Sequence, residues 1–92
     1  MSEAEEQVTV ITTETEYITE ADELVTDQVT AVVDIDGNVL ATDEIVTVEE
    51  PDGSAAFDEI VTVTDEDGDS VVIDEIAGAF DADGNGLVIE AD

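Results

Sequence analysis

The chain is 92 residues long and carries 28 Asp and Glu residues but no Lys, Arg or His, which gives a formal charge of −28. It also has no Cys, so disulfides and zinc sites built from Cys or His are excluded. Without basic residues there is no surface for direct nucleic-acid binding or for adsorption to an anionic membrane.

β-Branched residues dominate the apolar part of the composition. Val, Ile and Thr account for 33 of the 92 residues, whereas Leu occurs only three times. These residues favour strands over helices. Their abundance also argues against the disorder that high net charge would otherwise indicate. The length suits one domain, and we expect a single all-β domain over residues 8–92.

The first 35 residues show no obvious repeat. Residues 1–7 are acidic where a secretory signal would be basic and then apolar, and we expect them to be frayed. Val8 to Glu20 predicts an edge strand or an ordered arm, and Glu20 to Leu24 is a candidate start of a short helical turn. Val29, Ala31, Val33 and Ile35 place apolar side chains at every second position up to the first Asp-Gly turn. No segment is long enough to span a membrane, so we expect a cytoplasmic or virion-associated protein.

The rest of the chain is built from a repeat of about 16 residues. Asp-Gly occurs at residues 36–37, 52–53, 67–68 and 83–84, and Asp-Glu-Ile recurs at residues 43–45, 58–60 and 74–76. A fixed period indicates one supersecondary unit stacked on its neighbours. The repeats fall at about 36–51, 52–66, 67–82 and 83–92.

Two architectures fit this repeat. Asp-Gly between apolar runs is a strong hairpin signal and favours an antiparallel meander or small sandwich. Straight segments of about 13 residues would, however, span about 43 Å, too long for a compact domain of this size. We therefore expect a bend at the Asp-Glu step, where the apolar alternation loses phase. The bend would be a bulge in a meander, or a corner in a short β-solenoid.

The acidic turns are candidate calcium sites. Residues 81–86, Asp-Ala-Asp-Gly-Asn-Gly, resemble the first half of an EF-hand calcium loop, and residues 75–80 resemble its entering helix. At the loop's last position the chain has Asp92, where that family has a bidentate Glu. The candidate ligands are Asp81, Asp83 and Asn85, and, at the same spacing, Asp65, Asp67 and Asp69. Ordinary hairpin turns favour the same residues, so both interpretations stand, and Ca²⁺ is not required.

Catalysis has little support in these residue types. Carboxylate pairs are too numerous to single out an acid and a base. No Ser has a His partner, and no cationic side chain is present to stabilise an oxyanion. We expect a protein that is not an enzyme.

Carboxylates at alternate positions raise the possibility of a DNA mimic. Side chains at i and i+2 of a strand lie about 6.6 Å apart, close to the spacing of phosphates along one DNA strand. A surface of this kind would occupy the basic cleft of a nucleic-acid-binding protein. Any acidic strand has the same spacing. Four sets of acidic residues have this spacing in the sequence: Glu14 with Glu16; Asp34 with Asp36; Asp65 with Asp67 and Asp69; and Asp81 with Asp83.

The composition as a whole resembles that of proteins from extreme halophiles and their viruses, with Asp, Glu, Val, Thr and Ala in excess and Lys absent. The resemblance implies molar salt, where the Debye length is about 3 Å and like-charge repulsion is screened. We expect an acidic structural or assembly protein, such as a virion decoration or surface component. It would bind a protein partner or self-assemble as a homo-oligomer, with Tyr17, Phe57 and Phe80 as anchors or core residues.

Overall fold

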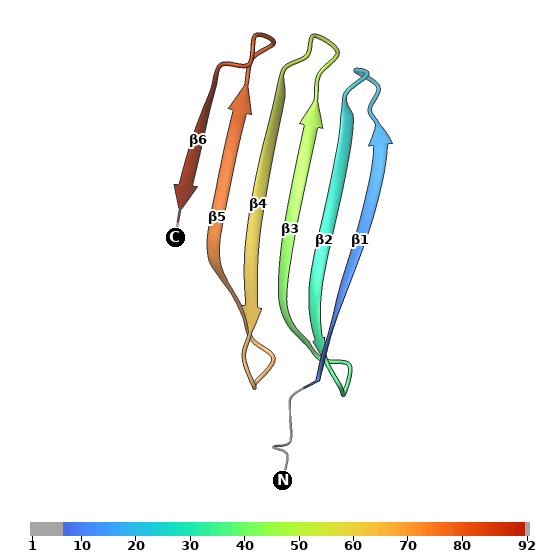
Figure 1. Ribbon diagram of the computed structural model, residues 1–92, viewed down its shortest axis with the longest axis vertical. Coiled ribbons are helices and arrows are strands. Elements are labelled where there is room, and N and C mark those ends of the chain that lie inside the picture. Colours follow the sequence, from blue (N-terminus) through green and yellow to red (C-terminus); the bar gives the residue numbers. More distant parts are fainter. Residues whose placement is uncertain (1–6, 92) are drawn as a thin grey trace.

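The computed structural model describes residues 7–91, and within that range the chain forms six β-strands and no helix. Each strand pairs antiparallel with its neighbours in the chain, so the sheet order is β1-β2-β3-β4-β5-β6 (Figure 1). The predicted meander is confirmed, and the described residues form neither a sandwich nor a solenoid. Of the segment expected to be frayed, only Gln7 lies among the described residues. The strands are β1 (Val8–Ile18), β2 (Leu24–Asp34), β3 (Val39–Glu49), β4 (Ala55–Thr64), β5 (Ser70–Phe80) and β6 (Gly86–Ala91).

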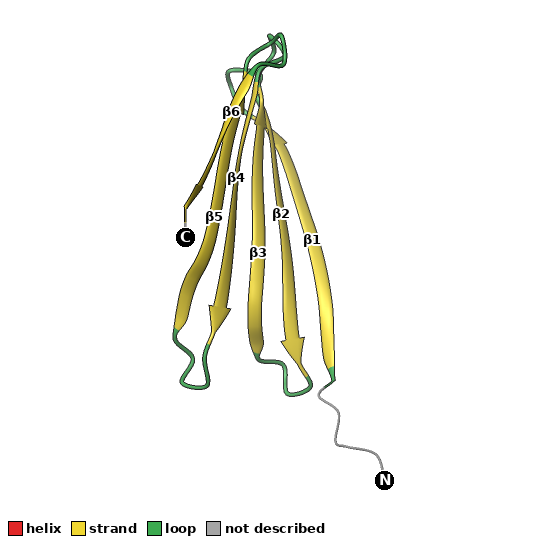
Figure 2. Ribbon diagram, turned by 60° about the vertical axis from the view of Figure 1, so that its left-hand side comes forward, coloured by secondary structure: helices red, strands yellow, loops and turns green. Residues whose placement is uncertain are grey.

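The sheet is a single twisted layer, and no other part of residues 7–91 packs on either of its faces (Figure 2). Its Cα radius of gyration is 17.0 Å and its principal extents are 58 × 26 × 26 Å, whereas a compact domain of this length has a radius of about 12 Å. Val25 is the one buried hydrophobic residue in the described part of the chain. The predicted bend at the Asp-Glu step is wrong for β3 and β4, whose pairing is regular through that step. In β5 a bulge does occur there, because the unpaired Ile73 directly precedes Asp74. The prediction assumed a compact domain, and this sheet is extended.

All five hairpin turns have the same geometry. In each five-residue turn the first N–H donates to the fifth carbonyl, at 2.8–2.9 Å, and the fourth N–H donates to the first carbonyl, at 3.0–3.1 Å. The fourth residue has a positive φ, which glycine adopts without strain. It is Gly in four turns, and in the first turn it is Asp22, with a φ of 63°. The turns are Thr19–Glu23, Asp34–Asn38, Glu50–Ser54, Asp65–Asp69 and Asp81–Asn85.

The repeat therefore begins earlier than the sequence indicated. Its turns start at residues 19, 34, 50, 65 and 81, so the steps alternate between 15 and 16 residues. The longer steps contain β3 and β5, and each of these strands has a bulge near its start. In β3 the register leaves Leu40 without a partner, and in β5 it leaves Ile73 without one. One extra residue per bulge accounts for the alternation.

The register places side chains in rows that cross the sheet. We call the side that carries Val25 face 1 and the side that carries Phe57 face 2. One row on face 1 is apolar over all six strands and lies near the end with three turns. One row on face 2 is apolar over five strands and lies near the end with two turns. The first consists of Tyr17, Val25, Val48, Ala56, Ala79 and Leu87, and the second of Val10, Val32, Ala41, Val63 and Val71.

The three aromatic residues expected to be anchors or core residues are not in an enclosed core. Tyr17 is 55% exposed on face 1, and Phe80 is 37% exposed on face 2. Phe57 and Phe80 stack on face 2, with ring centroids 6.3 Å apart and an interplanar angle of 16°. Together they cover part of face 2, over which the described residues place no second layer.

Candidate functional site

The strongest cluster of potential metal ligands lies in the turn between β4 and β5. One carboxylate oxygen from each of Asp65, Asp67 and Asp69 lies within 4.8 Å of the others, and all three side chains are exposed. In the described part of the chain this is the one group of three such residues. Oxygen ligands gathered in this way suit a hard cation such as Ca²⁺.

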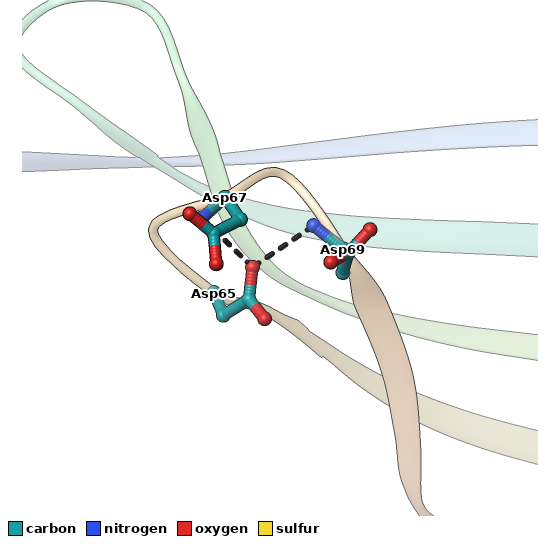
Figure 3. Close-up of side chains that lie close together, drawn as sticks. All are labelled: Asp65, Asp67 and Asp69. Atoms are coloured by element: carbon teal, nitrogen blue, oxygen red, sulfur yellow. Dashed lines mark hydrogen bonds between the residues drawn. The ribbon is translucent and has the colours of Figure 1, made fainter.

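The hydrogen bonds of the turn explain why these three side chains converge. Oδ1 of Asp65 accepts hydrogen bonds from the backbone N–H groups of Asp67 and Asp69, both at 2.9 Å (Figure 3). An Asp that bonds its own turn in this way is common hairpin chemistry. One oxygen of the cluster is therefore already engaged by the backbone.

Two sister turns show what is unusual about Asp69. In the Asp34 and Asp81 turns the fifth residue is Asn, and its Nδ2 donates to Oδ2 of the first Asp, at 3.3 and 3.5 Å. Hydrogen bonds from the backbone N–H groups of Asn38 and Asn85 lower the pKa of Asp34 and Asp81 below their ordinary values. At position 69 a carboxylate replaces this amide donor. The Asp65 turn therefore adds a negative charge where its sisters add a hydrogen-bond donor.

The other predicted calcium site is placed differently from an EF-hand loop. Asp81, Asp83 and Asn85 lie in the turn that joins β5 to β6, where Oδ1 of Asp81 accepts from the N–H groups of the other two at 2.9 Å. Residues 75–80 belong to β5, so the expected entering helix is wrong. Turn geometry accounts for these three residues, and calcium binding by them stays a prediction.

A hollow of about 510 Å³ lies between the Asp34–Asn38 turn and the Asp65–Asp69 turn, at the end of the sheet that has two turns. Three of its lining residues are acidic, Asp34, Asp65 and Glu66, and its apolar wall is Val39 and Leu40. The hollow lies beside the Asp65 cluster, and its acidic lining favours cations.

Two zigzags of carboxylates cross the middle of the sheet, and sequence reasoning did not find them. The Asp-Glu steps of adjacent strands stand side by side, so their side chains alternate between the two faces. The face 1 zigzag is Asp27, Glu44, Asp58 and Glu75, and the face 2 zigzag is Asp43, Glu59, Asp74 and Glu90. Finding them requires the cross-strand register, because neighbouring members lie about 15 residues apart in the chain.

The Asp residues of both zigzags are poorly solvated. One oxygen in each of Asp27, Asp43, Asp58 and Asp74 is buried and has no hydrogen-bond partner. Hydrogen bonding to the neighbouring Asp raises the pKa of Glu44, Glu59 and Glu75 above the ordinary value. A proton shared between two close carboxylates relieves their repulsion, which is why the pKa rises.

Most of the carboxylates proposed as phosphate mimics are not on strands. Glu14 and Glu16 lie in β1, where the expected spacing along a strand holds. The sets that begin at Asp34, Asp65 and Asp81 lie in hairpin turns, where the chain reverses direction and the strand spacing does not apply. DNA mimicry stays a prediction, and of its four residue sets the pair Glu14 and Glu16 keeps the expected strand spacing.

Comparison with family models, with curated proteins and with solved structures finds no match to this chain. Among residues 7–91 no helix is long and apolar enough to cross a membrane.

Proposed function

We propose that this protein is a non-enzymatic acidic structural protein that self-assembles at high salt, as a virion decoration or surface component would. The observation that carries the proposal is the single-layer sheet with unpartnered faces and edges. Strands and sheets become stable by burying an apolar face against another layer. In the described chain no second layer is present, so other copies are the natural source of further burial.

The exposed apolar side chains support this proposal. Fifteen large hydrophobic residues of the described chain are exposed, among them Ile18 at 70% and Leu87 at 65%. Exposed apolar surface of this extent commonly marks an interaction surface. Twelve of the fifteen lie on β1, β5 and β6, which form the two margins of the sheet.

The charge distribution supports a high-salt environment. All 28 charged side chains are acidic, so each cross-strand charge contact costs a fraction of a kcal/mol. Many such contacts, summed over the zigzags, are comparable to the stability of a small domain. At molar salt a Debye length of about 3 Å screens most of this repulsion, both within one sheet and between copies.

Sedimentation velocity of the full chain tests the proposal. Samples in 0.1 M and 3 M KCl, both with EDTA, are compared over a hundredfold range of protein concentration. Self-assembly predicts species larger than the monomer that grow with concentration in 3 M KCl. A folded monomer at every concentration in 3 M KCl would contradict the proposal.

Calcium binding is a second candidate function, favoured by the convergence of Asp65, Asp67 and Asp69. The test measures the melting temperature in 0.1 M KCl with EDTA or with 1 mM CaCl₂. A functional site predicts a calcium-dependent rise that Asp69→Asn removes. The substitution suits the fold because Asn occupies the same position in two sister turns. An equal rise in wild type and Asp69→Asn would contradict a functional calcium site in the Asp65–Asp69 turn.

A further inference from the structure

The two edges of the sheet are equivalent to strand margins that already pair inside it. The turn geometry repeats along the chain, so β2, β4 and β6 occupy corresponding positions, as do β1, β3 and β5. The edge by which β2 pairs with β3, and β4 pairs with β5, corresponds to the outer edge of β6. In the same way, the outer edge of β1 corresponds to the edge by which β3 pairs with β2 and β5 pairs with β4. Among the described residues, no strand pairs with either outer edge.

We propose that copies of this chain join head to tail, with β6 of one copy paired antiparallel to β1 of the next. The proposal rests on the self-assembly proposed above and identifies the surface that carries it. The internal β2–β3 register, in which Leu24 faces Glu49, places Gly86 opposite Ile18 of the next copy. The ladder then runs to Ala91, opposite Thr13 of the next copy.

The free backbone groups of the two edges match in this register. The bond from the Asp81 N–H to the Asn85 carbonyl makes these residues a hydrogen-bonded pair. Bonded and non-bonded pairs alternate along an antiparallel ladder, so Gly86, Val88 and Glu90 direct their N–H and C=O groups away from β5. The same reasoning from the Thr19–Glu23 bond directs those of β1 outward at alternate residues. These are Glu14, Glu16 and Ile18, the residues that the register sets opposite Glu90, Val88 and Gly86.

The side chains favour the same junction on face 1. Leu87 and Tyr17 are the two ends of the apolar row, and they are 65% and 55% exposed. In the proposed register Leu87 lies beside Tyr17 of the next copy, so the row continues unbroken from one sheet into the next. Cross-strand pairs of aromatic and aliphatic side chains stabilise sheets.

The edges lack three of the features that usually prevent such pairing. Lys, Pro and bulges commonly block sheet edges, and neither β1 nor β6 contains any of them. Their acidic residues are Glu14, Glu16 and Glu90, and Glu90 would stand opposite Glu14 of the next copy. This repulsion makes the junction dependent on molar salt. A head-to-tail contact that does not close produces an open filament.

Two proline variants test the junction in 3 M KCl. Val88→Pro removes an outward N–H from β6, and Glu16→Pro removes one from β1. Neither N–H takes part in the ladder to the neighbouring strand of the same copy. Val88→Ala and Glu16→Ala are the matched controls, because they keep the N–H. Circular dichroism checks that each variant is folded.

The expected result is that each proline variant alone sediments as a monomer while both Ala controls assemble like wild type. An equimolar mixture of the proline variants keeps one intact β6 edge and one intact β1 edge, and forms a dimer but nothing larger. Folded proline variants that assemble like wild type would overturn the junction while leaving self-assembly intact. A dimer of Glu16→Pro alone would show β6-to-β6 pairing and would overturn it as well.

Hydrogen exchange on the wild-type chain provides a second measurement that needs no variant. The amides of Val88 and Glu16 should exchange rapidly in monomer at low protein concentration and at least tenfold more slowly in the assembled state. Unchanged exchange at both amides in an assembled sample would place the contact elsewhere on the sheet.

Discussion

The ring of Phe57 lies against Gly78, its cross-strand partner in β5, so closely that a Cβ atom at position 78 would stand 3.0 Å from Cζ of the ring. Gly86 has a similar relationship to Phe80, and there a Cβ would also meet the carbonyl oxygen of Ala79 at 2.6 Å. Pairing an aromatic ring with glycine covers the bare backbone of a strand. In a sheet without a second layer, these two rings provide local cover of this kind on face 2.

We predict that the cost of Gly78→Ala depends on Phe57. In the wild-type chain the new methyl group displaces the ring and lowers the free energy of unfolding by about 1–2 kcal/mol. In a Phe57→Ala background the ring is absent, and the change should stabilise by about 0.5–1 kcal/mol, because Ala suits a strand better than Gly. A double-mutant cycle by urea unfolding in 3 M KCl measures the difference. Equal effects in both backgrounds would contradict the contact.

Asp22→Gly is predicted to stabilise the first turn. Asp22 adopts a φ of 63°, whereas the other four turns have Gly at this position. A left-handed conformation costs about 1–2 kcal/mol for an ordinary residue and less for Asp, so we expect a gain of up to about 1 kcal/mol. Asp36→Gly is the control, since Asp36 lies in a sister turn and its φ is not positive. Thermal unfolding that ranks Asp36→Gly as equally stabilising would refute this explanation.

Stability is predicted to pass through a maximum in mildly acidic solution. The pKa values of Glu44, Glu59 and Glu75 are raised from 4.5 by their Asp neighbours. A raised pKa means that the folded state binds protons more tightly, so stability increases as pH falls from 7 through these folded pKa values. Hydrogen bonds lower the pKa of Asp34, Asp52 and Asp81 from 3.8, and their contribution is lost as pH falls through the lowered values.

Melting temperatures between pH 7 and pH 3 measure this profile. We expect the midpoint to rise towards about pH 4.5 and to decrease again well below pH 3.8. Dilute samples are needed because protonation of the 28 carboxylates steadily removes the net negative charge as the pH falls. A midpoint that falls steadily from pH 7 would contradict the carboxylate pairs.

Removing the paired Glu charges should stabilise the fold at neutral pH, as mild acid is expected to do for the wild-type chain. An amide at position 44, 59 or 75 can donate a hydrogen bond to the neighbouring Asp, as a protonated Glu would. The triple change Glu44→Gln, Glu59→Gln and Glu75→Gln should raise the melting temperature at pH 7 by roughly 5 °C in 0.1 M KCl. Glu66→Gln, in an exposed turn, removes one charge outside the zigzags and serves as the control. Each single zigzag change should raise the midpoint more than this control does.

The sequence predicts the strand class and the turns well because both depend on local chemistry. β-Branched residues favour strands, and Asp-Gly supplies the positive φ that is found at Gly37, Gly53, Gly68 and Gly84. The first turn escaped notice because Thr19 and Asp22 perform the same roles without that dipeptide. Oγ1 of Thr19 accepts hydrogen bonds from Ala21 and Glu23 as the Asp residues do in their own turns.

The long-range features required information that the sequence does not state directly. The bulges at Leu40 and Ile73 decide which side chains share a row, and they follow from strand pairing. The expected bend came from assuming a compact domain. The carboxylate zigzags and the two apolar rows appear only once six strands are placed in register. Among the candidate metal ligands, the spacing of residues 65–69 correctly placed three carboxylates together, but could not tell a turn from a metal site.

The central claim, that this acidic sheet is a structure for high salt, is tested most directly by its unfolding midpoint as a function of KCl. Circular dichroism with EDTA present would follow thermal unfolding from 0.1 M to 3 M KCl. Screening of the cross-strand repulsion predicts a steady rise of at least 15 °C over this range, or a fold that forms only towards 3 M. An identical cooperative midpoint at 0.1 M and 3 M KCl would contradict the claim.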